Sequence, residues 1–187
     1  MDLSGRTWGA TDAERGASYP CDRLVAGRRE GWTRAVDVAA PPGVLFRWLR
    51  QLTVAPYSYD RIDFRGRRSP RVLLPDLPDL AVGQRLLLFD ITDFTPGAHI
   101  TGRLPDPLAA RHGPMAVSYT VRPQGTGSRL VVKVVAGSGG GAGRRLRRRL
   151  MAWGDLVMMR KQLLTLKELA EATAAAPGPS PAPGPTG

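Results

Sequence analysis

Residues 40–60 read APPGVLFRWLRQLTVAPYSYD. Proline is tolerated in the first turn of a helix, so Pro41-Pro42 marks a helix start. The residues just upstream, 32–38, alternate in the manner of a strand. The sequence therefore predicts a strand that leads directly into a helix, with a second short helix over residues 57–64. The first helix has an apolar face that must pack on another element, formed by Val44, Leu45, Trp48, Leu49 and Leu52.

The middle of the chain is rich in strand patterns. Four candidate strands are separated by Pro, Gly and Asp clusters and cover residues 85–90, 98–104, 115–122 and 129–136. Their close succession favours an antiparallel meander over alternating strands and helices. In the third strand the apolar residues share one face, and the other face carries Ser118, Thr120 and Arg122. We therefore expect a sheet with one fully apolar side.

The longest helical pattern of the chain runs from residue 144 to residue 174. The Gly-rich stretch before it, 137–143, matches a G-x-G-x-x-A pattern but lacks the second parallel strand that a dinucleotide site needs, so we interpret it as a hinge. Two apolar stripes lie side by side along the helix, as is typical of a helix packed on a sheet. The first stripe is Leu146, Leu150, Trp153, Val157 and Leu164, and the second is Leu156, Met159, Leu163, Leu166 and Ala170.

Composition divides the chain into three parts. Residues 1–30 are mostly polar, are interrupted by glycines and show no sustained period, so we expect an irregular N-terminal arm. Residues 31–175 hold the strands and helices of a single domain. The closing Pro- and Gly-rich stretch, 176–187, cannot continue a helix or build a core, and we expect a disordered tail.

The element order, together with several short motifs, resembles the SRPBCC or START-like helix-grip superfamily. The motifs are Ala40-Pro41-Pro42, Trp48-Leu49, Gln51-Leu52 and Tyr57-Ser58-Tyr59-Asp60. Residues 8–14 and 19–22 look like the leader of many actinobacterial members of unassigned role. The resemblance covers most of the chain. It implies an α+β helix-grip fold, in which a curved antiparallel sheet wraps around a long C-terminal helix, with two short helices after the first strand.

The resemblance also implies a cavity between the sheet and the C-terminal helix for a small hydrophobic molecule such as a lipid or a polyketide. Binding is the expected function. The alternative is a polyketide cyclase or dehydratase that uses the same cavity, without a metal or nucleotide cofactor. No catalytic residue is assigned. The candidate cavity residues are Trp48, Tyr57, Tyr59, Asp60, Val117, Tyr119, Leu130, Val132, Trp153, Asp155, Val157 and Arg160.

Two groups of these candidates have a structural alternative. Tyr57, Tyr59 and Asp60 would either contact a ligand at the pocket entrance or tie the second helix to the sheet. Asp155 and Arg160 would either point into an apolar cavity or form an ion pair at the edge of the long helix. Both alternatives stay open at the level of sequence.

Charge adds a third interpretation, that of an interaction protein. The chain has 27 Lys and Arg against 16 Asp and Glu, a formal net charge of +11. The arginines at 144, 145 and 147–149 would allow docking on nucleic acid or on an anionic membrane. However, the basic residues are 24 Arg and only 3 Lys, alongside abundant Ala, Gly and Pro, so we attribute much of the charge to composition.

Cysteine and histidine usage restricts the chemistry. The single Cys21 cannot form an internal disulfide, and neither His99 nor His112 has metal-ligand spacing or a nucleophile pattern nearby, so no metal or cofactor is expected. No signal peptide or membrane-length apolar run is recognisable, and we therefore expect a cytoplasmic protein. The sequence leaves the oligomeric state open.

Overall fold

The computed structural model of the protein describes residues 7–58, 68–137 and 142–176, with the side chains of the last helix described from Val157 onward. The strands are β1 (Thr7–Trp8), β2 (Arg29–Val38), β3 (Arg85–Leu86), β4 (Phe89–Thr95), β5 (His99–Arg103), β6 (Met115–Gln124) and β7 (Gly127–Gly137). The α-helices are α1 (Asp12–Gly16), α2 (Pro42–Arg50), α4 (Asp106–His112) and α5 (Ala142–Ala175). The 3-10 helices are η1 (Pro20–Arg23) and η2 (Gln51–Thr53).

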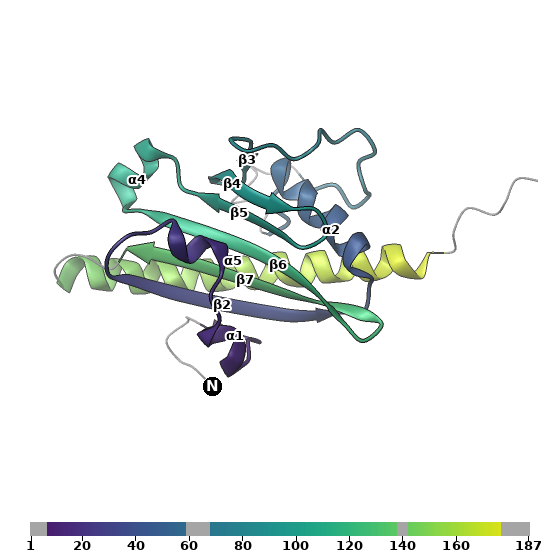
Figure 1. Cartoon of the computed structure of the whole chain (residues 1–187), viewed down its shortest axis with the longest axis horizontal. Helices are drawn as coiled ribbons and strands as arrows, with labels where there is room; N and C mark the ends of the chain where they lie inside the picture. Colours follow the sequence, from purple (N-terminus) through teal and green to yellow (C-terminus); the bar gives the residue numbers. More distant parts are fainter. Residues whose placement is uncertain (1–6, 59–67, 138–141, 177–187) are drawn as a thin grey trace, which may run out of the picture.

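The strands form one sheet in the order β1-β2-β7-β6-β5-β4-β3, and α5 runs along one side of it (Figure 1). Neighbouring strands are antiparallel except for β1, which pairs with β2 in parallel through Thr7 and Thr33. The structure is α+β. It confirms the predicted strand-to-helix passage, the antiparallel meander and the long C-terminal helix.

One side of the sheet, which we call the helix-facing side, carries the larger cluster of buried apolar residues. Because side chains alternate along a strand, Trp32 and Arg34 of β2 point to the same side. In the register of the sheet, Trp32 lies opposite Val134 and Arg34 lies opposite Val132, which in turn lies opposite Tyr119. This side is the wall on which α2 and α5 pack.

The C-terminal half of α5 is bonded to the end of β2 and the residue that follows it. Lys167 donates its Nζ to the backbone oxygen of Asp37 at 2.6 Å. Glu171 accepts the backbone N–H of Ala39 at 2.7 Å and also binds Lys167 at 2.7 Å. Lys167 contacts Asp37, and Glu171, farther along α5, contacts Ala39, farther along the chain after β2. Helix α5 therefore runs in the same direction as β2.

The opposite side of the sheet, the outer side, is covered by the N-terminal segment, which we define as residues 7–25 (Figure 1). The backbone N–H of Cys21 donates to Ser118 Oγ at 3.0 Å, and Ser118 Oγ lies 2.8 Å from Thr101 Oγ1. Ser118 and Thr101 are fully buried. The stretch expected to be an irregular arm therefore contains β1, α1 and η1, and it buries polar residues predicted for an open face.

Two local features differ from the sequence prediction. The strand predicted over residues 85–90 is divided into β3 and the start of β4 by a tight turn, in which Leu87 adopts a left-handed φ of 57°. The helix α4 was not predicted. It is seven residues long and has no buried residue, so no apolar period marked it in the sequence.

The two apolar stripes of α5 differ in burial. Val157 and Leu164, from the first stripe, are 48% and 39% exposed. The helix turns its second stripe toward the sheet, where the buried residues are Met159, Leu163, Leu166 and Ala170. The expected disordered tail and most of the expected second short helix and hinge lie outside the described residues.

Candidate functional site

Four predicted cavity residues lie together on the helix-facing side of the sheet. Val117 and Tyr119 of β6 stand next to β7, whose Val132 pairs with Tyr119 and whose Leu130 pairs with Val121. All four side chains are at most 1% exposed. The alternation of β6 and β7 places them there, because every second residue of each strand points toward α5.

A buried hydrogen-bond chain connects this wall to α5. Tyr119 donates its hydroxyl to Gln162 Oε1 at 2.9 Å, and Gln162 donates its Nε2 to the backbone oxygen of Pro56 at 2.6 Å. The Tyr119 hydroxyl also lies 3.9 Å from Met159 Sδ. Strand β6, helix α5 and the loop after η2 are therefore joined by polar groups inside an apolar interior.

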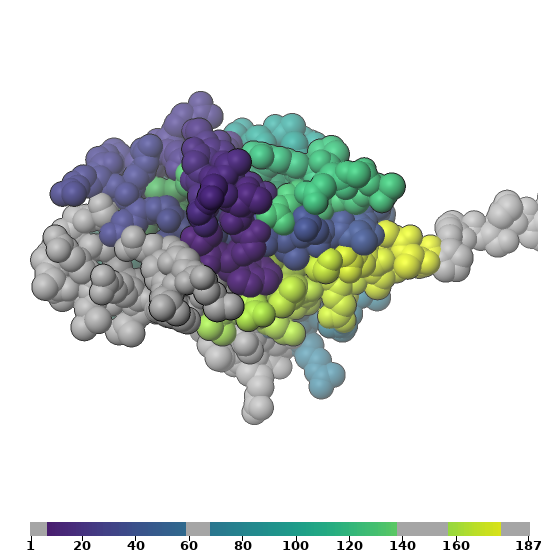
Figure 2. All heavy atoms as spheres, turned by 90° about the horizontal axis from the view of Figure 1, so that it is seen from below, coloured from purple at the N-terminus to yellow at the C-terminus, as the bar shows by residue number. Residues whose placement is uncertain are grey.

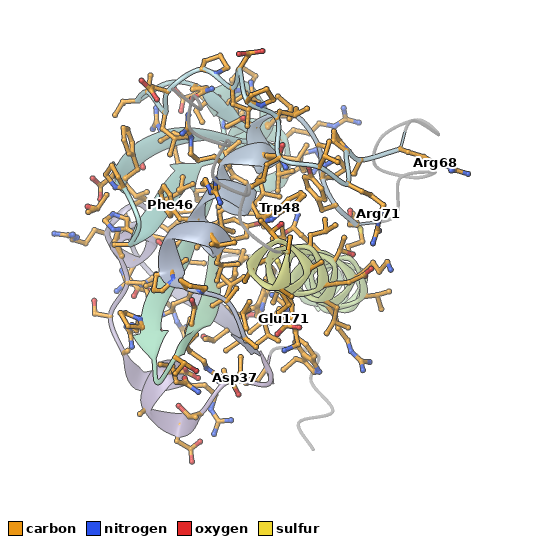
Figure 3. All side chains as sticks on the ribbon, turned by 90° about the vertical axis from the view of Figure 1, so that its right-hand side faces the viewer. Asp37, Phe46, Trp48, Arg68, Arg71 and Glu171 are labelled. Carbon is orange, nitrogen blue, oxygen red and sulfur yellow. The ribbon has the colours of Figure 1, made fainter. Side chains whose placement is uncertain are left out.

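Trp48 and Tyr57 form a second junction next to the first. Their rings meet edge to face, with centroids 6.0 Å apart and an interplanar angle of 88°. Trp48 lies on the α2 side of α5 (Figure 3) and donates its Nε1 to Thr173 Oγ1 at 3.0 Å. The hydroxyl of Tyr57 accepts Gln51 Nε2 at 2.9 Å, and the backbone N–H of Tyr57 donates to Ser69 Oγ at 3.1 Å.

These contacts favour the structural role of Tyr57 over ligand contact. Tyr57 is 1% exposed and has a left-handed φ of 53°, a conformation that costs a non-glycine residue free energy. Gln51, which binds its hydroxyl, also accepts the backbone N–H of Leu74 at 2.8 Å through Oε1. Tyr57 thus ties the loop after η2 to α2 and to the segment around Leu74.

Two further residues, Trp32 and Arg34, lie on the same wall and were not among the predicted cavity residues. Arg34 is fully buried, although it is a charged residue on the helix-facing side of β2. Trp32, two residues before it, is 2% exposed, and its indole Nε1 has no hydrogen-bond partner in the described part of the chain. The signal was present in the sequence: Arg34 stands in phase with Trp32, Val36 and Val38.

The remaining predicted cavity residues divide into two groups. Tyr59 and Asp60 lie outside the described residues, as do the side chains of Trp153 and Asp155. Val157 and Arg160 are exposed, because α5 presents its Met159 stripe to the sheet instead.

Arg160 stacks over the ring of Trp8 in the N-terminal segment, with its guanidinium carbon 5.4 Å from the ring centroid. Figure 2 shows this segment beside the visible part of α5. The prediction that both residues line the cavity is therefore corrected. Val157 lies at the surface of α5, and Arg160 lies at the edge of the helix, next to Trp8.

The described residues hold no group of three or more His, Cys, Asp or Glu side chains that could bind a metal ion. His99 lies at the sheet surface with its Nε2 2.9 Å from Asp93 Oδ2. Burial raises the pKa of the Cys21 thiol, which is fully buried. Within the described ranges, no helix has the length and apolar character required to cross a membrane.

The order of elements is strand, helix, antiparallel meander and a long C-terminal helix packed on the sheet. The chain has a helix-grip fold. This is the fold that the SRPBCC-like motifs predicted, so the resemblance holds at the level of architecture.

Comparisons with known proteins give similarities to solved structures and no family assignment. No protein-family model matches the chain, and no curated protein matches it. Among solved structures it is similar to the KanY protein, at 16% identity over 78% of this chain and 99% of that chain, with a TM-score of 0.48. It is similar to protein Ms6760 from Mycobacterium smegmatis, at 16% identity over 83% and 96%, with a TM-score of 0.48. It is also similar to the di-domain ARO/CYC StfQ from the steffimycin biosynthetic pathway, at 15% identity over 79% and 52%, with a TM-score of 0.44.

Proposed function

We propose that the protein binds a small, mostly apolar molecule that carries a carboxylate or a similar acceptor group, in the interior between the helix-facing side of the sheet and α5. Arg34 carries this proposal, because its side chain is fully buried beside Val132 on that wall. A guanidinium stays protonated in proteins and carries five N–H donors, so it can bind the acceptor group of a ligand in addition to acceptors of the protein. A ligand carboxylate would match its donors in a bidentate fashion.

Trp32 supports the same location. Its ring is buried two residues from Arg34 on the same side of β2, and its Nε1 donor has no partner among the described residues. A buried donor without an acceptor costs free energy, which a ligand oxygen would recover. Arg34 and Trp32 thus supply two donors that could orient one end of a ligand.

The apolar wall supports binding of the rest of the ligand. Val117, Leu130 and Val132 form the floor of this side of the sheet. The C-terminal half of α5 is bonded to Asp37 and to the residues around it, and α5 runs parallel to β2. Trp32 therefore lies toward the turns of α5 that precede Arg160, away from the bonded half. A site there would have an apolar floor, as ligand sites commonly do.

The proposal is one of binding and does not extend to catalysis. Tyr119 already donates its hydroxyl to Gln162, and His99 is paired with Asp93 at the surface. The cyclase interpretation and the docking of nucleic acid or membrane stay predictions from the sequence.

The test is titration of the protein with cis-parinaric acid, whose fluorescence rises in an apolar site, and with its methyl ester as a ligand lacking the carboxylate. We expect wild type to bind the acid more tightly than the ester. Replacement of Arg34 by Met keeps the apolar length of the side chain and removes the charge. It should raise the dissociation constant of the acid at least about tenfold and leave that of the ester nearly unchanged.

Two further variants make the result decisive. Trp32→Phe keeps the ring and removes the indole donor, so it should weaken binding severalfold even if Arg34→Met fails to fold. Arg103→Gln removes a charge from an exposed position and should have no effect. The proposal is wrong if wild type binds neither probe, or if folded Arg34→Met and Trp32→Phe both bind the acid like wild type.

A further inference from the structure

A hollow lies on the outer side of the sheet, away from α5. It is a pocket of about 430 Å³ between the N-terminal segment and the outer side of β2 and β7. We call it the outer pocket. Its polar lining includes Thr7, Arg15, Asp22, Arg29, Thr33 and Lys133. In Figure 1 the part of the N-terminal segment that follows α1 passes in front of the sheet, whereas α5 is behind it.

The wall of the outer pocket is held in place by direct bonds. Strand β1 is paired with β2, and Thr7 lies opposite Thr33, so both belong to the pocket lining. Farther along the segment, Arg129 of β7 binds Glu14 through two hydrogen bonds of 2.8 and 2.9 Å and the backbone oxygen of Gly9 at 2.7 Å. The pocket is therefore formed by ordered elements and not by a loose arm.

Asp22 and Lys133 neutralise each other inside the pocket. Lys133 Nζ lies 2.9 Å from Asp22 Oδ2 and donates to the backbone oxygen of Ala17 at 3.2 Å. The same Asp22 oxygen accepts the backbone N–H of Tyr19 at 2.7 Å, and Lys133 rests over the Tyr19 ring at 5.2 Å. Because Asp22 and Lys133 neutralise each other, the net positive charge of the outer pocket comes from its two arginines, Arg15 and Arg29.

Arg29 and Arg15 are both exposed and both line the pocket. Arg29 donates Nη1 to the backbone oxygen of Val25 at 3.3 Å, and Arg15 forms an ion pair with the exposed Asp12. A guanidinium has five N–H donors, so each arginine keeps donors for another acceptor. Two guanidinium groups at one polar pocket provide forked donors and positive charge, the combination that recognises phosphate.

We propose that the outer pocket binds a small polar phosphate ester, such as a sugar phosphate, through Arg15 and Arg29. The volume falls within the range of small-molecule sites, and the lining is polar and cationic where the proposed interior site is apolar. The ion pair between Lys133 and Asp22 would hold the N-terminal segment against β7 at the floor of the pocket. The hydroxyl groups of Thr7 and Thr33 would contact the polar body of the ligand. This site is separate from the one under Proposed function and does not depend on it.

The test is isothermal titration calorimetry at moderate salt with glucose 6-phosphate, inorganic phosphate and glucose. We expect glucose 6-phosphate to bind more tightly than inorganic phosphate, and glucose to show no binding. Arg29→Gln should weaken glucose 6-phosphate binding by about tenfold or more, because a charge-assisted bidentate contact is lost. Arg15→Gln should weaken it by a smaller factor, because Asp12 already shares that guanidinium.

The matched control is Arg85→Gln, which removes the same charge from β3 at the far edge of the sheet. It should change the affinity less than about twofold, because screening weakens such distant charges. Amide NMR shifts of Gly31 and Thr33 on titration would place the ligand in the outer pocket. Glucose 6-phosphate should not displace cis-parinaric acid.

Three outcomes would overturn the proposal. One is an absence of binding of glucose 6-phosphate at millimolar concentration. Another is an equal loss in Arg29→Gln and Arg85→Gln, which would indicate attraction by the net charge alone. The third is equal affinity for inorganic phosphate and glucose 6-phosphate, which would mean that the pocket does not recognise the ester.

Discussion

Replacing Glu14 by Gln should destabilise the protein strongly at neutral pH and much less in acid. Glu14 belongs to α1, and Arg129 of β7 binds both of its carboxylate oxygens at 2.8 and 2.9 Å. The two side chains are only 11% and 13% exposed, so solvent screens the pair little. The hydrogen bonds from Arg129, opposed by burial and aided by Thr11, lower the pKa of Glu14 from 4.5 to about 2.

The pKa shift sets the magnitude. A fall from 4.5 to about 2 corresponds to roughly 3 kcal/mol of stability, since one pKa unit is worth about 1.4 kcal/mol. Because the folded-state pKa is depressed, this contribution is fully present above pH 4.5. It is lost as the pH falls from 4.5 toward 2, where the folded protein also becomes protonated.

The assay is urea unfolding of wild type and Glu14→Gln at a series of pH values, with tryptophan fluorescence as the signal. The difference in unfolding free energy should be about 3 kcal/mol at pH 7, constant down to about pH 5, and should shrink at lower pH. The control, Glu168→Gln, removes an exposed partner of Arg71 and should cost less than about 1 kcal/mol. A difference below about 0.5 kcal/mol at pH 7, or one that does not change with pH, would refute the reasoning.

Two further predictions concern the core. Cys21 is fully buried, and burial raises the pKa of its thiol. The native protein should therefore not react with a thiol reagent at mildly alkaline pH, whereas the denatured chain should react. Rapid labelling of the native protein would contradict this packing. Trp48→Phe and Thr173→Val each remove the 3.0 Å bond between α2 and α5. A double-mutant cycle measured by urea unfolding should give a coupling of about 1 kcal/mol, and additive effects would argue against the bond.

The strand-to-helix passage was predictable because its signals are local. Prolines at 41 and 42 mark the start of α2, which begins at Pro42, and the apolar period of α2 places Trp48 in the core. The alternation in β6 likewise placed Val117 and Tyr119 on one buried face. These patterns repeat within a few residues, so they can be read without knowledge of distant contacts.

The candidate site was predictable only in part. The apolar floor followed from strand alternation, but Gln162 and Gln51 hold their positions through partners far away in the sequence, Tyr119 and Leu74. Arg34 shared the phase of apolar neighbours in its strand, yet a charged residue in phase with apolar ones has two explanations, a buried group or an edge position. Only the packing of α5 against β2 distinguishes them.

By itself the sequence determined the strand-to-helix passage, the strand alternation and the wide apolar face of the last helix, because each depends on a short period along the chain. The tertiary structure decided which stripe of α5 is buried, because Val157 and Met159 are both apolar and only the direction in which the helix packs on the sheet separates them. It also decided that the N-terminal segment covers the outer side of the sheet. That placement depends on bonds such as Arg129 to Glu14, whose partners lie more than a hundred residues apart and leave no periodic trace in the sequence.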